Sequence, residues 1–149
     1  MTAHNGKTAG KTGILDSELK EFKEVKNFRE AYKSLPSHGA IYIFLYDSKI
    51  NRLKGSSPIL KIGETTNLKK RMARYFNAKD IQQIENKPKR QTAYRLRKFI
   101  DSKETSQVKL YFKVVPKMSK SDFRNEEKRL LEMYITEHLE TPPLNMGMS

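Results

Sequence analysis

The sequence predicts a mixed α/β fold of the α+β kind, with a small three-stranded antiparallel sheet flanked by helices. Two apolar segments, residues 40–46 and 59–62, are separated by turn-forming residues and indicate a hairpin. A third segment, 108–115, alternates apolar and polar side chains as a strand with one solvated face does. Between these segments apolar residues recur every three to four positions, which is typical of amphipathic helices.

Three regions follow one another along the chain. Residues 1–13 are small and polar, so we expect a disordered lead-in. Residues 14–36 are predicted to form an N-terminal helical extension of one or two helices, ended by Pro36. The remaining residues, 37–149, form the main domain. The apolar positions with helical spacing in the extension are Leu19, Phe22, Val25, Phe28 and Tyr32.

Within the main domain, residues 47–58 are rich in Asp, Asn, Gly, Ser and Pro and predict a long turn. Three helices are expected at 68–76, 92–101 and 122–140, the last stopped by the pair of prolines at 142–143. A polar, basic insert covers about 77–100.

Composition points to a polyanionic partner. Lys and Arg outnumber Asp and Glu by 30 to 17, which gives a formal net charge of +13. The absence of cysteine excludes disulfides, Cys-ligated zinc and thiol nucleophiles, and it is typical of a reducing cytoplasm. No apolar run approaches the roughly 20 residues of a membrane span, so no membrane is expected. Nucleic acid is the partner that the charge favours.

A charged residue interrupts the apolar stripe of the helix at 68–76. Arg71 lies three residues after Leu68 and four before Tyr75, which places it on the apolar face. An arginine on that face either binds an anion or lies at the rim with its head in water.

The helix at 122–140 repeats this pattern with an acidic residue. Glu127 falls near the centre of the stripe formed by Leu130, Leu131 and Tyr134, whereas Glu132 is rotated roughly 120° from it. Glu127 is the candidate functional carboxylate. The alternative is an acidic residue that only complements the helix dipole.

Four short motifs, in this order, resemble the GIY-YIG nuclease superfamily over about residues 38–146. They are Ala40-Ile41-Tyr42, Lys61-Ile62-Gly63, Asn67-Leu68-x-x-Arg71 and Pro142-Pro143-Leu144-Asn145. The sequence departs from the family at Lys61, where most members have tyrosine, although lysine occurs there in a restriction-endonuclease branch. Glu64 is a further departure, to which the sequence assigns no role.

The resemblance implies roles for the residues at matching positions. Tyr42 would be the general base and Arg71 would hold the scissile phosphate, while Lys61 could stabilise the phenolate and Tyr75 would contact the phosphate. Gly63 would allow close backbone approach, and Asn145 would be structural or site-supporting.

The family's metal-binding glutamate has two candidates here. Glu127 is favoured by the face on which it lies, and Glu132 is the fallback because the family's spacing back from Asn145 ends near it. A single carboxylate suits a hard divalent ion, Mg²⁺ or Mn²⁺.

These inferences predict a metal-dependent endonuclease acting on DNA, with RNA not excluded, as a monomer or homodimer. A standalone enzyme of restriction, phage or mobile-element type is expected. The alternatives are a catalytically silent nucleic-acid-binding module on the same fold and an unrelated RNA-associated protein.

Basic residues on two helices and the insert are the candidate phosphate contacts, unless they only form a solvated face. They are Lys69, Lys70, Arg74, Lys87, Lys89, Arg90, Arg95, Arg97 and Lys98.

Overall fold

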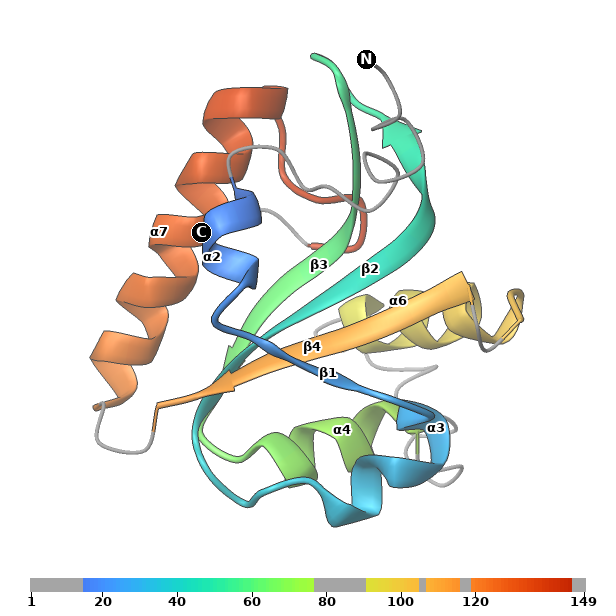
Figure 1. Ribbon diagram of the computed structural model, residues 1–149, viewed down its shortest axis with the longest axis vertical. Coiled ribbons are helices and arrows are strands. Elements are labelled where there is room, and N and C mark those ends of the chain that lie inside the picture. Colours follow the sequence, from blue (N-terminus) through green and yellow to red (C-terminus); the bar gives the residue numbers. More distant parts are fainter. Residues whose placement is uncertain (1–14, 77–90, 105–106, 116–118, 146–149) are drawn as a thin grey trace.

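The computed structural model describes residues 15–76, 91–104, 107–115 and 119–145, which form an antiparallel sheet with helices on both faces (Figure 1). In chain order the elements are α2 (Asp16–Leu19), β1 (Lys23–Val25), α3 (Phe28–Ala31), η2 (Tyr32–Ser34), β2 (Ala40–Asn51), β3 (Ser56–Thr65), α4 (Leu68–Phe76), α6 (Gln91–Asp101), β4 (Val108–Val114) and α7 (Lys120–His138).

The sheet has four strands in the order β1-β4-β2-β3, not the three that the sequence predicts. The added strand is β1, which lies inside the segment expected to be wholly helical and pairs with β4 through Lys23 and Phe112. Its three residues are too few for a period-two pattern to stand out, and its partner lies far away in the sequence. Residues 23–25 are therefore a strand because they pair with the distant β4, not because of their local sequence pattern.

The central hairpin is longer than expected. Strand β2 continues to Asn51 and β3 begins at Ser56, so the turn is much shorter than the predicted 47–58. Gly55 closes it with a φ of +68°, a conformation that favours glycine. The polar residues 47–49 are exposed on a ribbon that extends past the core, which is why their composition resembles that of a turn.

Two apolar cores lie on opposite faces of the sheet, because successive residues of the central strand β2 point to opposite sides. Tyr42 and Phe44 belong to the core under α3, α4 and α6. Ile41, Ile43 and Leu45 belong to the core under α7. Buried on both faces, β2 is a rigid base for a polar site.

The three main helices lie close to their predicted positions. The bounds of α4 are confirmed, and α6 begins one residue earlier than expected. Helix α7 begins two residues early because Ser119 caps it: the Ser119 hydroxyl accepts from the Asp122 N–H at 3.2 Å, and the Asp122 carboxylate accepts from the Ser119 N–H at 3.1 Å. In the described part of the chain, no helix is both long and apolar enough to cross a membrane.

Candidate active site

Two tyrosines and an arginine meet on the α4 side of the sheet. The Tyr42 hydroxyl on β2 lies 2.7 Å from the Tyr75 hydroxyl on α4, and both side chains are buried. Arg71 is one helical turn before Tyr75, and its Nη1 donates to the Tyr42 hydroxyl over a long 3.4 Å. The sequence placed all three among the catalytic candidates, and the fold brings them together.

Gly63 makes room for the Tyr42 ring. The two residues are directly paired across β2 and β3. A Cβ at position 63 would lie 2.4 Å from Tyr42 Cζ and 2.5 Å from its hydroxyl oxygen. The close approach that the sequence predicted therefore involves an aromatic ring lying over the glycine, and any larger residue would displace the hydroxyl.

Burial controls the protonation of this cluster. It raises the pKa of Tyr42 well above the ordinary value, and the Tyr75 hydroxyl adds to the effect, whereas the Arg71 guanidinium acts to lower it. The phenolic oxygen of Tyr42 raises the pKa of Arg71, with burial acting against it. Tyr42 is thus neutral and Arg71 cationic, so Tyr42 needs further positive charge to act as a base.

A second group of charges lies beside the first, at the β3 edge of the sheet. Lys61 is almost fully buried, at 8% exposure. Glu127, on α7, is half-buried, and its pKa is raised first by burial and then by the Glu64 carboxylate. Lys61 and Arg71 act on the same Glu127 carboxyl in the opposite direction, so both cations lie within its electrostatic reach. Helix α7 covers the sheet face opposite the Tyr42 cluster, so Glu127 is linked to that cluster electrostatically, through Lys61 and Arg71.

The two glutamates proposed as metal ligands differ in position. Glu132 is exposed on α7, whereas Glu127 is half-buried and its pKa responds to Glu64, Lys61 and Arg71. Glu64, which the sequence left without a role, lies close enough to raise the pKa of Glu127. The signal for Glu64 was its place directly after Gly63, next to a predicted site residue.

The donor set suits a hard divalent cation. In the described ranges, no three His, Cys, Asp or Glu side chains gather as a metal cluster. The Glu127 carboxylate, with Glu64 beside it, offers one or two oxygen ligands and leaves the other positions to water and substrate phosphate. Mg²⁺ is commonly bound through one or two carboxylates in this way.

Asn145 closes the free edge of β3. Its side-chain oxygen accepts from the Ile62 N–H at 3.0 Å, and its amide donates to the Ile62 carbonyl at 2.8 Å. The Leu144 N–H donates to the Leu60 carbonyl at 2.9 Å. These bonds satisfy backbone groups on the open edge of β3, the strand that carries Lys61 and Gly63. A further strand could otherwise pair with those groups.

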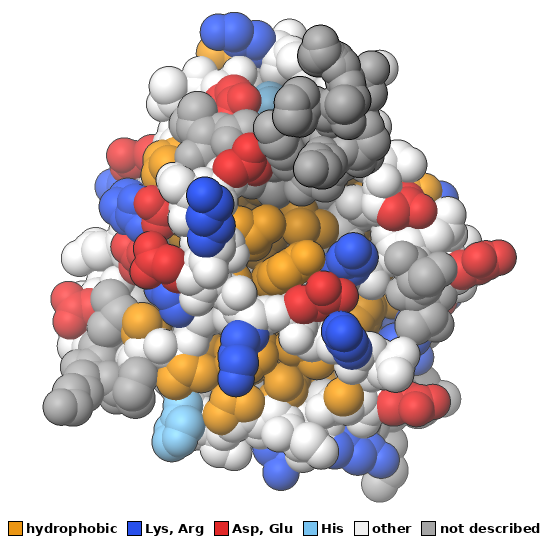
Figure 2. All heavy atoms as spheres, viewed as in Figure 1, with side chains coloured by type: hydrophobic (Ala, Val, Ile, Leu, Met, Phe, Trp, Pro, Cys, Tyr) orange, Lys and Arg blue, Asp and Glu red, His pale blue; other side chains and the backbone are white. Residues whose placement is uncertain are grey.

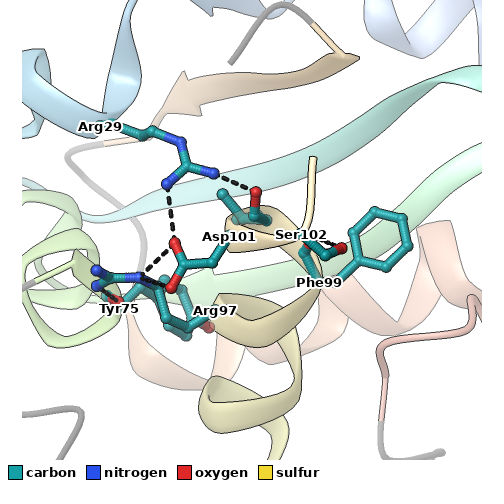
Figure 3. A network of polar contacts seen from close by, with 7 residues as sticks. Arg29, Tyr75, Arg97, Phe99, Asp101 and Ser102 are labelled. Atoms are coloured by element: carbon teal, nitrogen blue, oxygen red, sulfur yellow. Dashed lines mark hydrogen bonds and ion pairs between the residues drawn. The ribbon is translucent and has the colours of Figure 1, made fainter. Parts of the chain in front are cut away.

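One arginine predicted to contact DNA makes several bonds within the protein (Figure 3). Arg97 Nε donates to both Asp101 carboxylate oxygens, at 3.0 and 2.9 Å, and its Nη1 donates to the Tyr75 carbonyl at 2.9 Å. Arg29 donates to the same carboxylate at 2.9 Å and to the Ile100 carbonyl. Arg97 therefore braces the helix end that carries Tyr75. The spacing of Arg97 and Asp101, four residues apart, was the available signal.

The other predicted phosphate contacts lie in several places. Lys69 and Lys70 are exposed on α4, and Arg74 is half-buried there. Arg95 Nη2 donates to the Pro143 carbonyl at 2.8 Å, and Lys98 is exposed on α6. The remaining three, Lys87, Lys89 and Arg90, lie outside the described residues.

Comparison with known proteins finds structural similarity only. No protein-family model matches the chain, and no curated protein matches it. Among solved structures, it is similar to the GIY-YIG N-terminal endonuclease domain of UvrC from Thermotoga maritima bound to its catalytic divalent cation, magnesium, with 20% identity, a TM-score of 0.46, and coverage of 82% of this chain and 99% of that chain. A point mutant of that domain matches with 20% identity, a TM-score of 0.47, and 82% and 98% coverage. A likeness at this level carries no conclusion about activity.

Proposed function

We propose that this protein is a metal-dependent endonuclease of the GIY-YIG type, which hydrolyses phosphodiester bonds in DNA. The observation that carries the proposal is the meeting of Tyr42, Tyr75 and Arg71, with Glu127 within electrostatic reach of the arginine. The consecutive elements β2, β3 and α4, together with α7 from much later in the chain, contribute the residues of the proposed site. The order of the sequence motifs supports the same conclusion.

The chemistry assigned to these residues is a one-step hydrolysis. In its deprotonated form, Tyr42 accepts a proton from the attacking water as the water oxygen bonds to phosphorus and the P–O bond to the leaving strand breaks. Arg71 binds the scissile phosphate and stabilises the charge that builds on it. Lys61 lies two residues before Gly63, so their positions share one face of β3, and Gly63 is the residue that contacts Tyr42. We assign to Lys61 the role of supplying positive charge to the phenol, which would favour its deprotonated form. Tyr75 holds the Tyr42 hydroxyl in place.

Glu127 is the residue that would hold the divalent ion, with Glu64 as its carboxylate neighbour. When bound, Mg²⁺ or Mn²⁺ would supply Lewis acidity and neutralise phosphate charge. The high net positive charge favours DNA as the polyanion, with RNA as a second possible substrate. A standalone cytoplasmic enzyme of restriction, phage or mobile-element type, acting as a monomer or homodimer, completes the proposal.

The test is cleavage of supercoiled plasmid with Mg²⁺, comparing wild type with Tyr42→Phe and Glu127→Ala. Glu132→Ala is the matched control, because it makes the same change at an exposed position of the same helix. We expect Tyr42→Phe to slow cleavage by about 10²–10⁴-fold, the range for loss of general-base catalysis. We expect Glu127→Ala to abolish Mg²⁺-dependent cleavage. If only Glu132→Ala abolishes Mg²⁺-dependent cleavage, Glu132 is the metal ligand and the assignment of Glu127 is wrong.

One observation favours a second candidate, a silent DNA-binding module on this fold. The Tyr42 side chain has no exposed surface, and its hydroxyl is already bonded to Tyr75. A water molecule would need access to that hydroxyl before Tyr42 could activate it. Binding of plasmid, branched and single-stranded DNA by wild type without any Mg²⁺-dependent cleavage would establish this alternative.

A further inference from the structure

The two sides of helix α7 carry charge in different ways. On one side Arg129 bridges Glu126 at 2.8 Å and Glu18 of α2 at 2.7 Å, and Lys113 of β4 reaches Glu126 at 3.6 Å. This side packs against α2, which lies beside α7 in Figure 1. Its charges are neutralised within the protein.

The other side carries a row of positive charge. Lys120, Arg124 and Lys128 are all exposed, and within the described residues none of them forms an ion pair. We call these three residues the basic row. They follow one another at intervals of four residues, so each is about 6 Å further along the axis and rotated by roughly 40°.

A row of this kind slightly destabilises its own helix. Like charges four residues apart cost about 0.2–0.5 kcal/mol per pair, and a lysine in the first turn opposes the helix dipole. Helix stability therefore does not account for Lys120, Arg124 and Lys128. The row ends one turn later at the exposed Glu132.

The row lies directly beside the proposed metal ligand. Glu127 precedes Lys128 and is three residues after Arg124, so both basic residues are within one helical turn of it. A strand bound along the row would pass next to the Glu127 carboxylate and the charges that surround it.

We propose that the basic row binds consecutive backbone phosphates of one strand of duplex DNA and holds that strand along α7 beside Glu127. This rests on the proposed function in that DNA is the substrate. The row spans about 12 Å, and DNA rises by about 3.4 Å per nucleotide of one strand, so the row covers roughly three to four nucleotides. Phosphate contacts of this kind position the duplex without choosing its sequence.

The test compares two triple variants that lose the same charge. The first changes the basic row, as Lys120→Gln, Arg124→Gln and Lys128→Gln. The control changes three exposed lysines of β1, its following turn and β4, as Lys23→Gln, Lys26→Gln and Lys109→Gln. The face over β1 and β4 mixes basic and acidic side chains around an apolar centre, as Figure 2 shows. Glutamine is a good helix former, so the row variant should fold and melt no lower than wild type.

Binding is measured by fluorescence anisotropy of a labelled duplex of mixed sequence, in EDTA so that no cleavage occurs, from about 50 to 200 mM salt. We expect the row variant to bind at least about tenfold more weakly and its log–log salt slope to flatten by about two to three, since each phosphate contact contributes about 0.9. The control should retain most of the wild-type slope.

Equal flattening in both variants would overturn the proposal, because general charge would then explain binding. So would an unchanged row variant, or a wild type that binds no duplex. Failure of the nuclease proposal is a separate result: it would be seen as normal, row-dependent binding in EDTA and no cleavage when Mg²⁺ is added.

Discussion

Two arginines on neighbouring helices, Arg71 of α4 and Arg97 of α6, have opposite surroundings. Arg97 is ion-paired with Asp101, which it shares with Arg29, and bonded to a backbone carbonyl of α4. Arg71 contacts a phenol at 3.4 Å, and within the described residues it forms no ion pair with a carboxylate. Both were candidates for phosphate binding from the sequence, yet only Arg71 retains a charge that an incoming anion would neutralise.

This difference separates positive charges that stabilise the protein itself from those that remain available to bind an anion. An arginine whose Nε is bonded to a carboxylate and whose Nη1 is bonded to a carbonyl has fewer donors left for a phosphate and gains less from one. An arginine held among neutral phenols is costly to keep partly buried, and its cost falls when an anion binds. The Arg97 network and the Arg71 cluster share Tyr75, so the first supports the helix end on which the second depends.

In the comparison of these two arginines, the largest expected effect comes from removing Arg71. We expect Arg71→Ala to slow cleavage by about 10²–10³-fold, comparable with the loss of an oxyanion-stabilising donor. Its melting temperature should change little, because the bond that it loses is long. Plasmid cleavage and thermal melting of the same preparation measure both. Asp101→Ala is the counterpart, expected to reduce stability while folded protein still cleaves, and equal kinetic loss in the two variants would break the distinction between them.

Gly63→Ala should disturb the Arg71 cluster without touching its charges. The added Cβ would lie within van der Waals overlap of the Tyr42 ring, so the ring has to move away from Tyr75. We expect a loss of about 1–3 kcal/mol of stability by overpacking, together with reduced cleavage. Urea unfolding and the plasmid assay measure the two effects. Wild-type behaviour in both would show that the position of Tyr42 is not fixed by this contact.

Asp101→Ala tests the Arg97 network by itself. Arg29 and Arg97 both lose a charged partner. The Nε of Arg29 is already buried without a hydrogen-bond partner. Because the Asp101 side chain is 44% exposed, solvent reduces the penalty, and we expect a loss of about 1–2 kcal/mol in urea unfolding. If Arg97 instead contacts DNA, Arg97→Gln should flatten the salt slope of binding by about 0.9, whereas we expect that slope to stay unchanged.

The smallest effect is the pH dependence of the same network. Burial acts to raise the pKa of Asp101, but hydrogen bonds from Arg29 and Arg97 outweigh it, so the pKa is lowered overall. A lowered folded-state pKa means that the stabilisation is complete above the unfolded value of about 3.9 and is lost as pH falls through the folded value. The stability difference between wild type and Asp101→Asn should therefore shrink on acidification below about pH 4. A constant difference would show that Asp101 does not titrate with these arginines.

Much of the fold followed from local pattern, and the errors share one physical cause. Helix α4 and strand β4 carry strong periodicity over seven or more residues and were located well, and the unbroken apolar run at 40–46 located the start of β2. Strand β1 was missed because its three residues gain their structure from β4, across a separation that no local pattern records. The extra length of the hairpin likewise comes from pairing between two polar segments.

Some residues of the candidate site could also be predicted from local pattern, whereas contacts between distant elements could not. Arg71 and Glu127 were identified because charge inside an apolar stripe is visible in the sequence. The approach of Glu64 to Glu127 was invisible, since it depends on how α7 lies against β3. The prediction that Arg97 contacts DNA rests on its clustering with other basic residues, whereas its spacing from Asp101 indicates the ion pair that the structure shows. Composition thus predicts a polyanionic partner, and the fold decides which cations are left to face one.

The Asn145 contact with Ile62 has a consequence for how the protein is made. The two residues are separated by 83 positions, so at about 5–20 residues per second a ribosome needs roughly 4–17 s to add the second after the first. Until Asn145 is added, the Ile62 edge of β3 lacks the side chain that covers it. An open strand edge is a template for pairing with other chains, so this edge is the part of the hairpin most exposed to wrong association during synthesis.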